Sequence, residues 1–459
     1  MEIERFYLGC LAHASYLVYD AGEAAVIDPQ RDIDIYLERA SELNLRIRWV
    51  IETHLHADFV SGHLELANRS GATICIGAGS GATYRHRELH DADELALGAT
   101  TLQVLATPGH TEESVSILAV EHGRPIAIFT GDTLFIGDVG RPDLSPSKTP
   151  EQLAAMLFDS LHQKLLTLPG QTIVFPAHGA GSLCGRSMSD DASSTIDRER
   201  RTNYALQPMS RDQFVHLLTG DLPPRPTYFQ DEVARNRTGA LPLEELPQVP
   251  ALSPTEAAAL HAAGAVVLDT RPWAQFAAAH IPGSINIALA GQFASWAARI
   301  LGISHSQVVL LAEDDAAVEE SRLRLARVGL ENVAGSVAGG IMAWIDDGRP
   351  VESVDQIAAA GLAEWLDSGA KIVLDVRDHS ERALGFIPGS VSIPLPELQE
   401  RFAELNPRQP IAVHCRGGYR SAIACSLLEA AGFSGVANVT GGYDAWALAS
   451  GNPAMATTH

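Results

Sequence analysis

Short apolar runs bounded by turn residues and charges recur along the first half of the chain. Residues 15–19 and 24–27 are runs of this kind, and their length and composition are typical of strands. Between residues 34 and 45 the apolar positions follow a helical period, which predicts an amphipathic helix. A further helix is predicted to begin at Pro150, with Glu151 in its first turn. This rhythm predicts two sheets covered by helices.

One stretch, residues 53–63, reads Thr-His-Leu-His-Ala-Asp-Phe-Val-Ser-Gly-His and follows an apolar run that predicts a buried strand. In it, His54 and His56 alternate with a third residue of ligand type, Asp58. Neutral imidazoles and a carboxylate are the ligands that a divalent transition metal prefers. For a single histidine, a polar loop or a hydrogen-bonded core residue would be the better interpretation. The sequence favours a metal site because the same arrangement recurs.

Apolar runs later in this half of the chain end on three more residues of ligand type, His110, Asp132 and His178. Strand ends converge at one edge of a sheet, and such edges are where folds of this kind place their sites. A purely structural explanation would have to treat this repetition as a coincidence. We therefore expect these residues to converge on one edge of a sheet.

The pattern resembles the metallo-β-lactamase superfamily, whose metal loop and later His, Asp and His match these positions. The resemblance covers roughly the first half of the chain and implies an αββα sandwich. The superfamily's loop usually reads His-x-His-x-Asp-His, but here the last position is Phe59. In dinuclear members that histidine helps to hold the second metal. The resemblance therefore implies a single metal in this chain.

Within the superfamily, the persulfide dioxygenases hold one Fe(II) through two histidines and one aspartate. The corresponding residues here are His54, His110 and Asp132. Two imidazoles and one carboxylate leave coordination positions open for O2 and a substrate. By this resemblance the other candidates would lie beside the metal or serve as alternative ligands: His56, Asp58 and His178. From the residues alone, His56 is an equal candidate, and Zn could substitute for iron.

The length, net charge and cysteine content of the chain limit the number of domains, the possible partners and the cellular compartment. The chain has 459 residues, enough for about three domains, and its formal net charge of −23 argues against nucleic acid or an anionic membrane as a partner. Its five cysteines are widely spaced and odd in number, so a reducing cytoplasm fits better than a disulfide framework. No signal-peptide pattern and no bilayer-spanning apolar run is expected. We expect a cytoplasmic protein.

Beyond a proline-rich stretch at residues 235–253, which is predicted to be a linker, the chain repeats itself. Val-Leu-Asp-Thr-Arg at residues 267–271 recurs as Val-Leu-Asp-Val-Arg at 373–377. The Gly-Gly-x-x-x-Trp motif at 339–344 recurs at 441–446. Each copy alternates strands with helices, which implies a mainly parallel sheet. Both copies resemble rhodanese domains.

The predicted architecture is a multidomain α/β and α+β chain. An N-terminal αββα sandwich is followed by two α/β rhodanese-like domains, of which only the second keeps the cysteine. The predicted bounds are residues 1–245, 251–350 and 353–452, followed by a tail at 453–459.

In the second copy a predicted strand ends on Cys415, and Arg-Gly-Gly-Tyr-Arg-Ser and a helix follow. The glycines let backbone N–H groups turn inward, and the helix N-terminus with Arg416 and Arg420 adds positive potential. Such surroundings favour a thiolate and bind a small anion. Cys425, mid-helix among apolar residues, is predicted to be buried and inert. The first copy has Glu313 in place of the cysteine, so no chemistry is expected there.

The rhodanese resemblance implies that Cys415 carries a persulfide sulfur and that Arg420 helps to bind the donor anion. The whole chain resembles a persulfide dioxygenase–rhodanese fusion. This implies oxidation of a low-molecular-weight thiol persulfide, such as glutathione persulfide, with O2 to sulfite or thiosulfate, at one Fe(II) per chain. A homo-oligomer is also expected.

Two alternatives remain. A glyoxalase II-like thioester hydrolase with an attached rhodanese would normally need two metals, so Phe59 counts against it. A non-enzymatic sulfur-binding protein would not need the retained ligand set.

Cys184 follows His178 in a glycine-rich loop, so it is expected close to the metal. It would either react with the persulfide substrate or be a small packing residue. A thiolate there would need positive surroundings, and Arg186 is the only nearby charge that the sequence offers.

Overall fold

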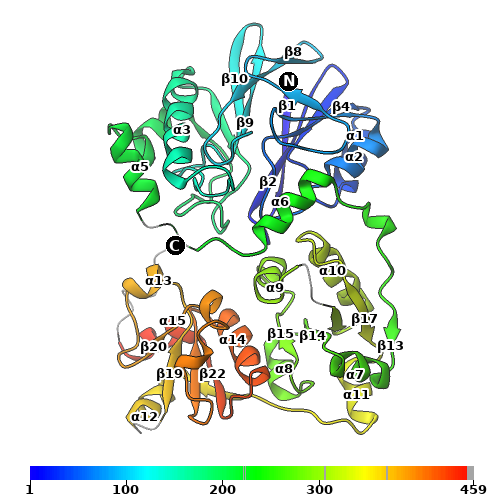
Figure 1. Ribbon diagram of the computed structural model, residues 1–459, viewed down its shortest axis with the longest axis vertical. Coiled ribbons are helices and arrows are strands. Elements are labelled where there is room, and N and C mark those ends of the chain that lie inside the picture. Colours follow the sequence, from blue (N-terminus) through cyan, green and yellow to red (C-terminus); the bar gives the residue numbers. More distant parts are fainter. Residues whose placement is uncertain (221, 223, 304–306, 368–370, 452–459) are drawn as a thin grey trace. The chain divides into compact units, whose positions relative to one another are not determined.

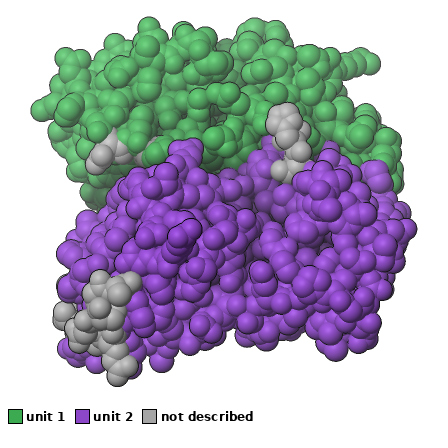
Figure 2. Space-filling view, turned by 60° about the horizontal axis from the view of Figure 1, so that its bottom comes forward, with its two compact units in different colours: residues 1–246, 325–330 green, residues 247–324, 331–459 purple. Residues whose placement is uncertain are grey.

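The computed structural model describes residues 1–451 except 221, 223, 304–306 and 368–370 (Figure 1). The tail predicted at 453–459 lies outside the described residues. By its internal contacts the chain divides into two compact units (Figure 2). The first comprises residues 1–246 and 325–330, and the second comprises residues 247–324 and 331–459. Within the described ranges, no helix has the length and apolar character needed to cross a membrane.

The first unit contains two six-stranded sheets. The strands of the first sheet follow the order of the chain and are β1 (Glu2–Leu8), β2 (His13–Asp20), β3 (Glu23–Ile27), β4 (Arg46–Glu52), β5 (Thr73–Gly77) and β6 (Arg87–Leu89). The second sheet runs from β12 back to β7, and its strands are β7 (Glu94–Leu97), β8 (Thr100–Ala106), β9 (Val115–Glu121), β10 (Arg124–Gly131), β11 (Ile173–Pro176) and β12 (Ser194–Thr195). Strands β3 to β6 pair in parallel, as do β10 and β11.

The described helices of this unit are α1 (Asp34–Glu42), α2 (His63–Ser70), α3 (Pro150–Gln163), α4 (Ile196–Thr202), α5 (Arg211–Thr219) and α6 (Phe229–Thr238), with short 3-10 turns at Leu165–Thr167, Tyr204–Leu206 and Leu243–Glu245. Helix α3 begins at Pro150, as predicted, because Thr149 and Gln152 cap its first turn reciprocally.

Apolar side chains from both sheets, among them Val18 and Phe129, form one buried cluster between the sheets. A second cluster joins α1 and α2 to the first sheet, and a third joins α3 and α5 to the second sheet. Removal of this apolar surface from water stabilises the layers. The arrangement confirms the predicted αββα sandwich.

The predicted linker at residues 235–253 is wrong at its start, because α6 extends through Thr238. The buried face of α6 consists of Phe229, Glu232 and Asn236, so two of its three buried side chains are polar. A helix that buries polar groups shows little apolar periodicity, and the pattern could not reveal it.

The second unit contains two five-stranded sheets whose strands all pair in parallel. The first sheet has the order β13-β17-β16-β14-β15, from β13 (Ala251–Leu252), β14 (Val266–Asp269), β15 (Ile285–Asn286), β16 (Val308–Leu311) and β17 (Val333–Val337). Its helices are α7 (Pro254–Ala262), α8 (Trp273–Ala278), α9 (Phe293–Leu301), α10 (Asp315–Ala326) and α11 (Gly340–Asp346).

The second sheet repeats this order as β18-β22-β21-β19-β20. Its strands are β18 (Asp355–Ala358), β19 (Ile372–Asp375), β20 (Val391–Ser392), β21 (Ile411–His414) and β22 (Val436–Thr440). Its helices are α12 (Leu362–Asp367), α13 (His379–Ala383), α14 (Tyr419–Ala430) and α15 (Gly442–Ala449), with 3-10 turns at Ala359–Gly361, Leu395–Glu397 and Phe402–Glu404.

The shared strand order confirms that the two copies have one fold with a parallel sheet. The repeated Asp-x-Arg motif has the same buried ion pair in each copy, Arg271 with Asp269 and Arg377 with Asp375. The Asp-x-Arg pair therefore repeats for a structural reason and does not mark the reactive site.

Candidate metal site and cysteine loop

Three side chains that follow strand ends of the first unit point their ligating atoms at one another. His54, His110 and Asp132 are each at most 2% exposed. Asp132 Oδ2 lies 3.8 Å from His54 Nε2 and 3.4 Å from His110 Nε2. None of these three atoms has a hydrogen-bond partner in the part of the chain that the structure describes. Buried polar atoms are rarely left unpaired, so the trio fits a metal that would satisfy all three.

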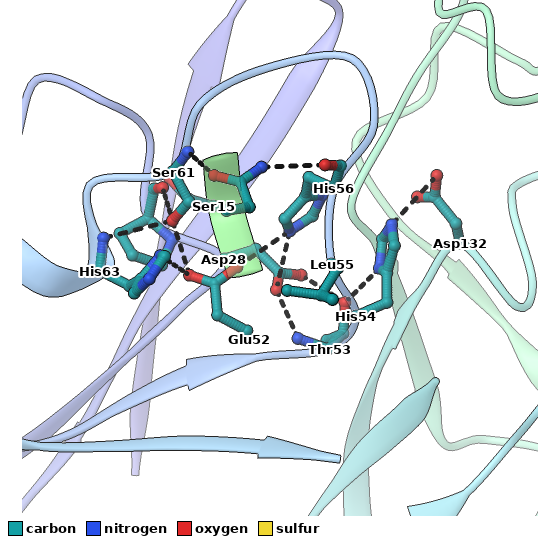
Figure 3. Close-up of polar contacts among 12 residues, drawn as sticks. Ser15, Asp28, Glu52, Thr53, His54, Leu55, His56, Ser61, His63 and Asp132 are labelled. Atoms are coloured by element: carbon teal, nitrogen blue, oxygen red, sulfur yellow. Dashed lines mark hydrogen bonds and ion pairs between the residues drawn. The ribbon is translucent and has the colours of Figure 1, made fainter. Parts of the chain in front are cut away.

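The hydrogen bonds behind the trio set the tautomers of both histidines. Thr53 Oγ1 donates to Asp28 Oδ2 at 2.9 Å, so its oxygen accepts from His54 Nδ1 at 3.0 Å (Figure 3). His110 Nδ1 donates to the Arg141 carbonyl at 3.0 Å. The Nε2 lone pairs of both rings are therefore free for a metal. Burial lowers the pKa of His54 and of His110, which keeps both rings in the neutral, ligating form.

His178 lies between two carboxylates. Its Nδ1 is 2.7 Å from Asp132 Oδ1, and its Nε2 is 3.0 Å from Asp58 Oδ2. Burial acts to lower the pKa of His178, but Asp132 and Asp58 outweigh it and hold that pKa well above its ordinary value. His178 thus contacts Asp132 Oδ1, while the other oxygen of Asp132, Oδ2, faces the two imidazoles.

The ring of His56 belongs to a different group of side chains. Its Nε2 lies 3.2 Å from Asp28 Oδ1 and 3.4 Å from Glu52 Oε2 (Figure 3). Burial raises the pKa of Glu52 to about 8. Burial acts to lower the pKa of His56, but the nearby carboxylates of Asp28 and Glu52 outweigh it and raise that pKa. The buried ring of Phe59 lies 4.4 Å from the His56 ring, centroid to centroid. Phe59 therefore packs as an apolar side chain in the metal loop, residues 53–63.

Two contacts of the metal loop were not predicted. The side chain of Asn236, from α6, donates to the carbonyls of His56 and Phe59 at 2.8 and 2.7 Å and accepts from the Ser61 amide at 2.9 Å. Gly131 has φ of +53°, and a Cβ there would collide with Thr53. No signal in the sequence marks Asn236, because it is a single polar residue in a stretch without apolar periodicity.

The structure also places His13 beside the metal loop, which the sequence analysis did not single out. His13 is fully buried, and its ring centroid lies 4.1 Å from that of Phe59 and 5.5 Å from that of His178. Its position at the start of β2 gave no indication of this.

Cys184 is buried, and its sulfur lies within 4.8 Å of ligand atoms of Asp58 and His178. Burial, followed by Asp58 and Asp132, raises the pKa of its thiol well above the ordinary value. Arg186 turns away and donates to the carbonyls of Leu217 and Leu218. The surroundings of Cys184 are thus acidic and favour the protonated thiol.

In the second unit, Cys415 follows β21 and opens a loop that runs into α14. The Gly418 amide donates to Cys415 Sγ at 3.1 Å. The Cys415 carbonyl accepts from the Tyr443 amide at 2.8 Å. Gly442 has φ of +59°, and a Cβ there would collide with the Cys415 and Arg416 carbonyls. The N-terminus of α15 therefore packs directly against the start of the Cys415 loop.

Both arginines of the loop face carboxylates. Arg420 donates to both oxygens of Glu381 at 2.5 and 2.7 Å, and Arg416 donates to Asp444 at 3.2 Å. The positive potential that the sequence suggested is thus partly neutralised. An anion at the loop would share these arginines with the acids.

At the equivalent strand end of the first copy, Glu313 accepts from the Gln275 side chain at 2.5 Å, and no nucleophile stands there. Cys425 in α14 is buried, and burial raises the pKa of its thiol well above the ordinary value. Of these two cysteines in the described part of the second copy, Cys415 lies at the loop and Cys425 lies within α14.

Comparison with known proteins agrees with this division. Residues 8–178 match the family model of the metallo-beta-lactamase superfamily, and residues 253–347 and 358–449 match that of the rhodanese-like domain. The chain is 32% identical over 230 residues to persulfide dioxygenase ETHE1 of Bos taurus, covering 48% of this chain and 82% of the relative. It is 30% identical over 287 residues to a probable metallo-hydrolase of Burkholderia pseudomallei (strain 1710b), covering 54% and 91%.

Among solved structures, a metallo-beta-lactamase from Staphylococcus aureus superposes with a TM-score of 0.66 at 30% identity. The match covers 73% of this chain and 98% of that protein, so it extends beyond the αββα sandwich.

Proposed function

Because the chain belongs to the metallo-β-lactamase superfamily and carries two rhodanese-like domains, we propose that it is a persulfide dioxygenase joined to a sulfurtransferase. The observation that supports this most directly is the buried trio of unpaired atoms on His54, His110 and Asp132. Two imidazoles and one carboxylate form a mononuclear site with open positions. Similarity to a persulfide dioxygenase over 82% of that protein's length supports the same reaction.

The proposed cofactor is one Fe(II) per chain, held by His54, His110 and Asp132, and Zn could occupy the same ligands. Bound iron would supply redox chemistry with O2. Thr53 and the Arg141 carbonyl hold the two imidazoles in the ligating tautomer, and His178 holds the carboxylate. The chain thus sets the ligand geometry before any metal binds.

The proposed overall reaction consumes a thiol persulfide, O2 and water. It yields the free thiol, hydrogen sulfite and a proton, which balances all atoms. Glutathione persulfide is the proposed type of substrate.

A thioester hydrolase is the less favoured alternative. A metal-activated water with two metals would need further ligands beside the trio. Phe59 cannot ligate, and His178 is held between Asp58 and Asp132. Within the described residues, Asp58, His178 and Cys184 form a second group of possible ligands beside the trio, so Phe59 is the observation that counts against a second metal.

Sulfur transfer is proposed at Cys415. Its thiolate would attack the outer sulfur of thiosulfate, the S–S bond would break, and sulfite would leave with the electron pair. The Gly418 amide, 3.1 Å from the sulfur, stabilises negative charge on it. The resulting persulfide would then pass its outer sulfur to an acceptor thiolate or back to sulfite.

Metal analysis combined with O2 uptake tests the proposal. Protein from iron-supplied cells should contain close to one iron per chain and consume O2 when glutathione persulfide is added. Two tightly held metals per chain, or thioester hydrolysis without O2 uptake, would support the hydrolase instead.

A further inference from the structure

The cysteine-less copy lies in the same compact unit as the catalytic copy and contacts its helix α14 through β15. The backbone amide of Asn286, in β15, donates to the Ser426 hydroxyl of α14 at 3.0 Å. His280 Nε2 lies 3.5 Å from Glu429, also in α14. The helix that follows the Cys415 loop is therefore held by the cysteine-less copy.

One of these contacts reaches the loop itself. The hydroxyl of Tyr419, the first residue of α14, donates to the Ala288 carbonyl at 2.9 Å. Ala288 begins a short segment that Arg324 of α10 fixes from the other side, by donating to the carbonyls of Leu289 and Gly291. The acceptor for Tyr419 is thus itself held in place.

Besides the ion pairs of Arg416 and Arg420, hydrogen bonds hold the Cys415 loop at both ends. At its start, the Cys415 and Arg416 carbonyls accept from backbone amides of α15. At its end, Tyr419 is bound to Ala288. Between them, added Cβ atoms on Gly417 and Gly418 would meet no atom within 4 Å, so neither glycine is packed against a neighbour. The Gly418 carbonyl accepts from the Ala422 amide and from the Ser421 hydroxyl, both at 3.1 Å, so the Gly418 amide that donates to the sulfur is positioned through the first turn of α14, which Tyr419 begins.

We propose that the cysteine-less copy acts as a positioning element for the Cys415 loop, with Tyr419 as the positioning residue. The Ala288 carbonyl holds the Tyr419 hydroxyl, and this keeps the Gly418 amide on the Cys415 sulfur. The inference rests on the proposed role of Cys415 as a nucleophile. It assigns a role to a domain that has no nucleophile of its own.

Tyr419→Phe in the full chain tests the proposal, because it removes the hydroxyl and keeps the ring. The measurement is the rate of Cys415 alkylation by iodoacetamide as a function of pH, followed by mass spectrometry of the Cys415 peptide. A weakened amide bond to the thiolate should slow alkylation roughly tenfold near about pH 6 and leave the high-pH plateau unchanged. A role limited to folding stability would not move the profile.

Apart from Tyr419 itself, this substitution replaces none of the charged and titratable residues near the Cys415 loop. They are Arg416, Arg420 and Cys425, the acids Asp378, Glu381 and Asp444, His414 with Asp375, Arg377 and Arg382, and, from the cysteine-less copy, Arg299 near Asp378 and Arg324 near Tyr419. A change in the profile can therefore be assigned to the hydroxyl.

Ser426→Ala is the matched control, since it removes another bond between the two copies at a distance from the loop. Its profile should match that of wild type. Arg324→Lys keeps the positive charge but removes the guanidinium group that donates to both the Leu289 and the Gly291 carbonyls. It should therefore shift the pH profile of alkylation in the same direction as Tyr419→Phe. This second variant serves if Tyr419→Phe does not fold.

Each outcome decides a separate point. A Tyr419→Phe profile that superimposes on wild type, or an equal shift in Ser426→Ala, overturns the positioning role. If Cys415→Ser transfers sulfur from thiosulfate as fast as wild type, the proposed sulfurtransferase site fails, independently of Tyr419.

Discussion

Replacement of Asn236 by alanine tests how the metal loop is held. The Asn236 side chain is 2% exposed and makes three hydrogen bonds to this loop, with His56, Phe59 and Ser61. Alanine removes all three and leaves two carbonyls and one amide without their partner. The loop carries His54, so its order affects the metal directly.

The expected cost follows from these bonds. A buried hydrogen bond contributes about 1 kcal/mol, and an unsatisfied buried group costs more, so we expect loop opening to become about 2–4 kcal/mol easier. At about 1.4 kcal/mol per factor of ten, this corresponds to roughly 30- to 700-fold faster amide exchange. Hydrogen-exchange mass spectrometry of peptides that cover residues 53–62 measures it. Metal affinity should fall in the same variant.

Asn203→Ala is the matched control. Asn203 is also fully buried, donates to the Asp138 carbonyl at 2.9 Å and accepts from the Ala205 amide at 3.0 Å, but it does not bond to the metal loop. It should lower the stability of the first unit without selectively speeding exchange at residues 53–62. Asn236 does not hold the loop in this way if Asn236→Ala changes amide exchange at residues 53–62 less than about threefold, or if both variants accelerate that exchange equally.

Four further outcomes are expected. Asp132→Ala should lose bound iron and O2 uptake, because only two imidazoles remain; retention of one iron by metal analysis would contradict the assigned ligands. Cys415→Ser should abolish sulfur transfer from thiosulfate but keep O2 uptake with glutathione persulfide. Loss of both activities in folded protein would show that O2 uptake also depends on Cys415. Cys184→Ser should keep full turnover, because burial and two carboxylates raise the pKa of that thiol, and mass spectrometry should find wild-type Cys184 unmodified by persulfide. Burial raises the pKa of Glu429 from 4.5 to about 8, so the folded chain retains a proton that the unfolded chain releases, and stability falls as pH rises through that window. Glu429→Gln should therefore raise Tm more at about pH 9 than at about pH 5, and an equal change at both would argue against this titration.

Much of the architecture could be predicted from local pattern. The apolar runs before His54, Asp132 and Cys415 are strands in the structure, and the residue after each run lies at a sheet edge. A strand buried on both faces needs a continuous apolar run, so its end is visible in the sequence. The repeat was visible for a similar reason, since two copies of one fold need the same buried Asp-x-Arg pair.

The sequence by itself therefore determined the fold class, the two rhodanese-like copies and the set of candidate residues for metal and sulfur chemistry. The family resemblance singled out His54, His110 and Asp132, whereas the residues alone left His56 an equal candidate. Only the tertiary structure shows that the His56 ring faces Asp28 and Glu52, and that the His178 ring lies between Asp132 and Asp58. Only the tertiary structure shows that the Asn236 side chain bonds to the metal loop and that the Ala288 carbonyl accepts from Tyr419. Hydrogen bonds between residues far apart in the chain leave no periodic trace, since each needs a single polar atom at one point in space. Apolar burial is repeated along an element, and for that reason it can be detected before the chain is folded.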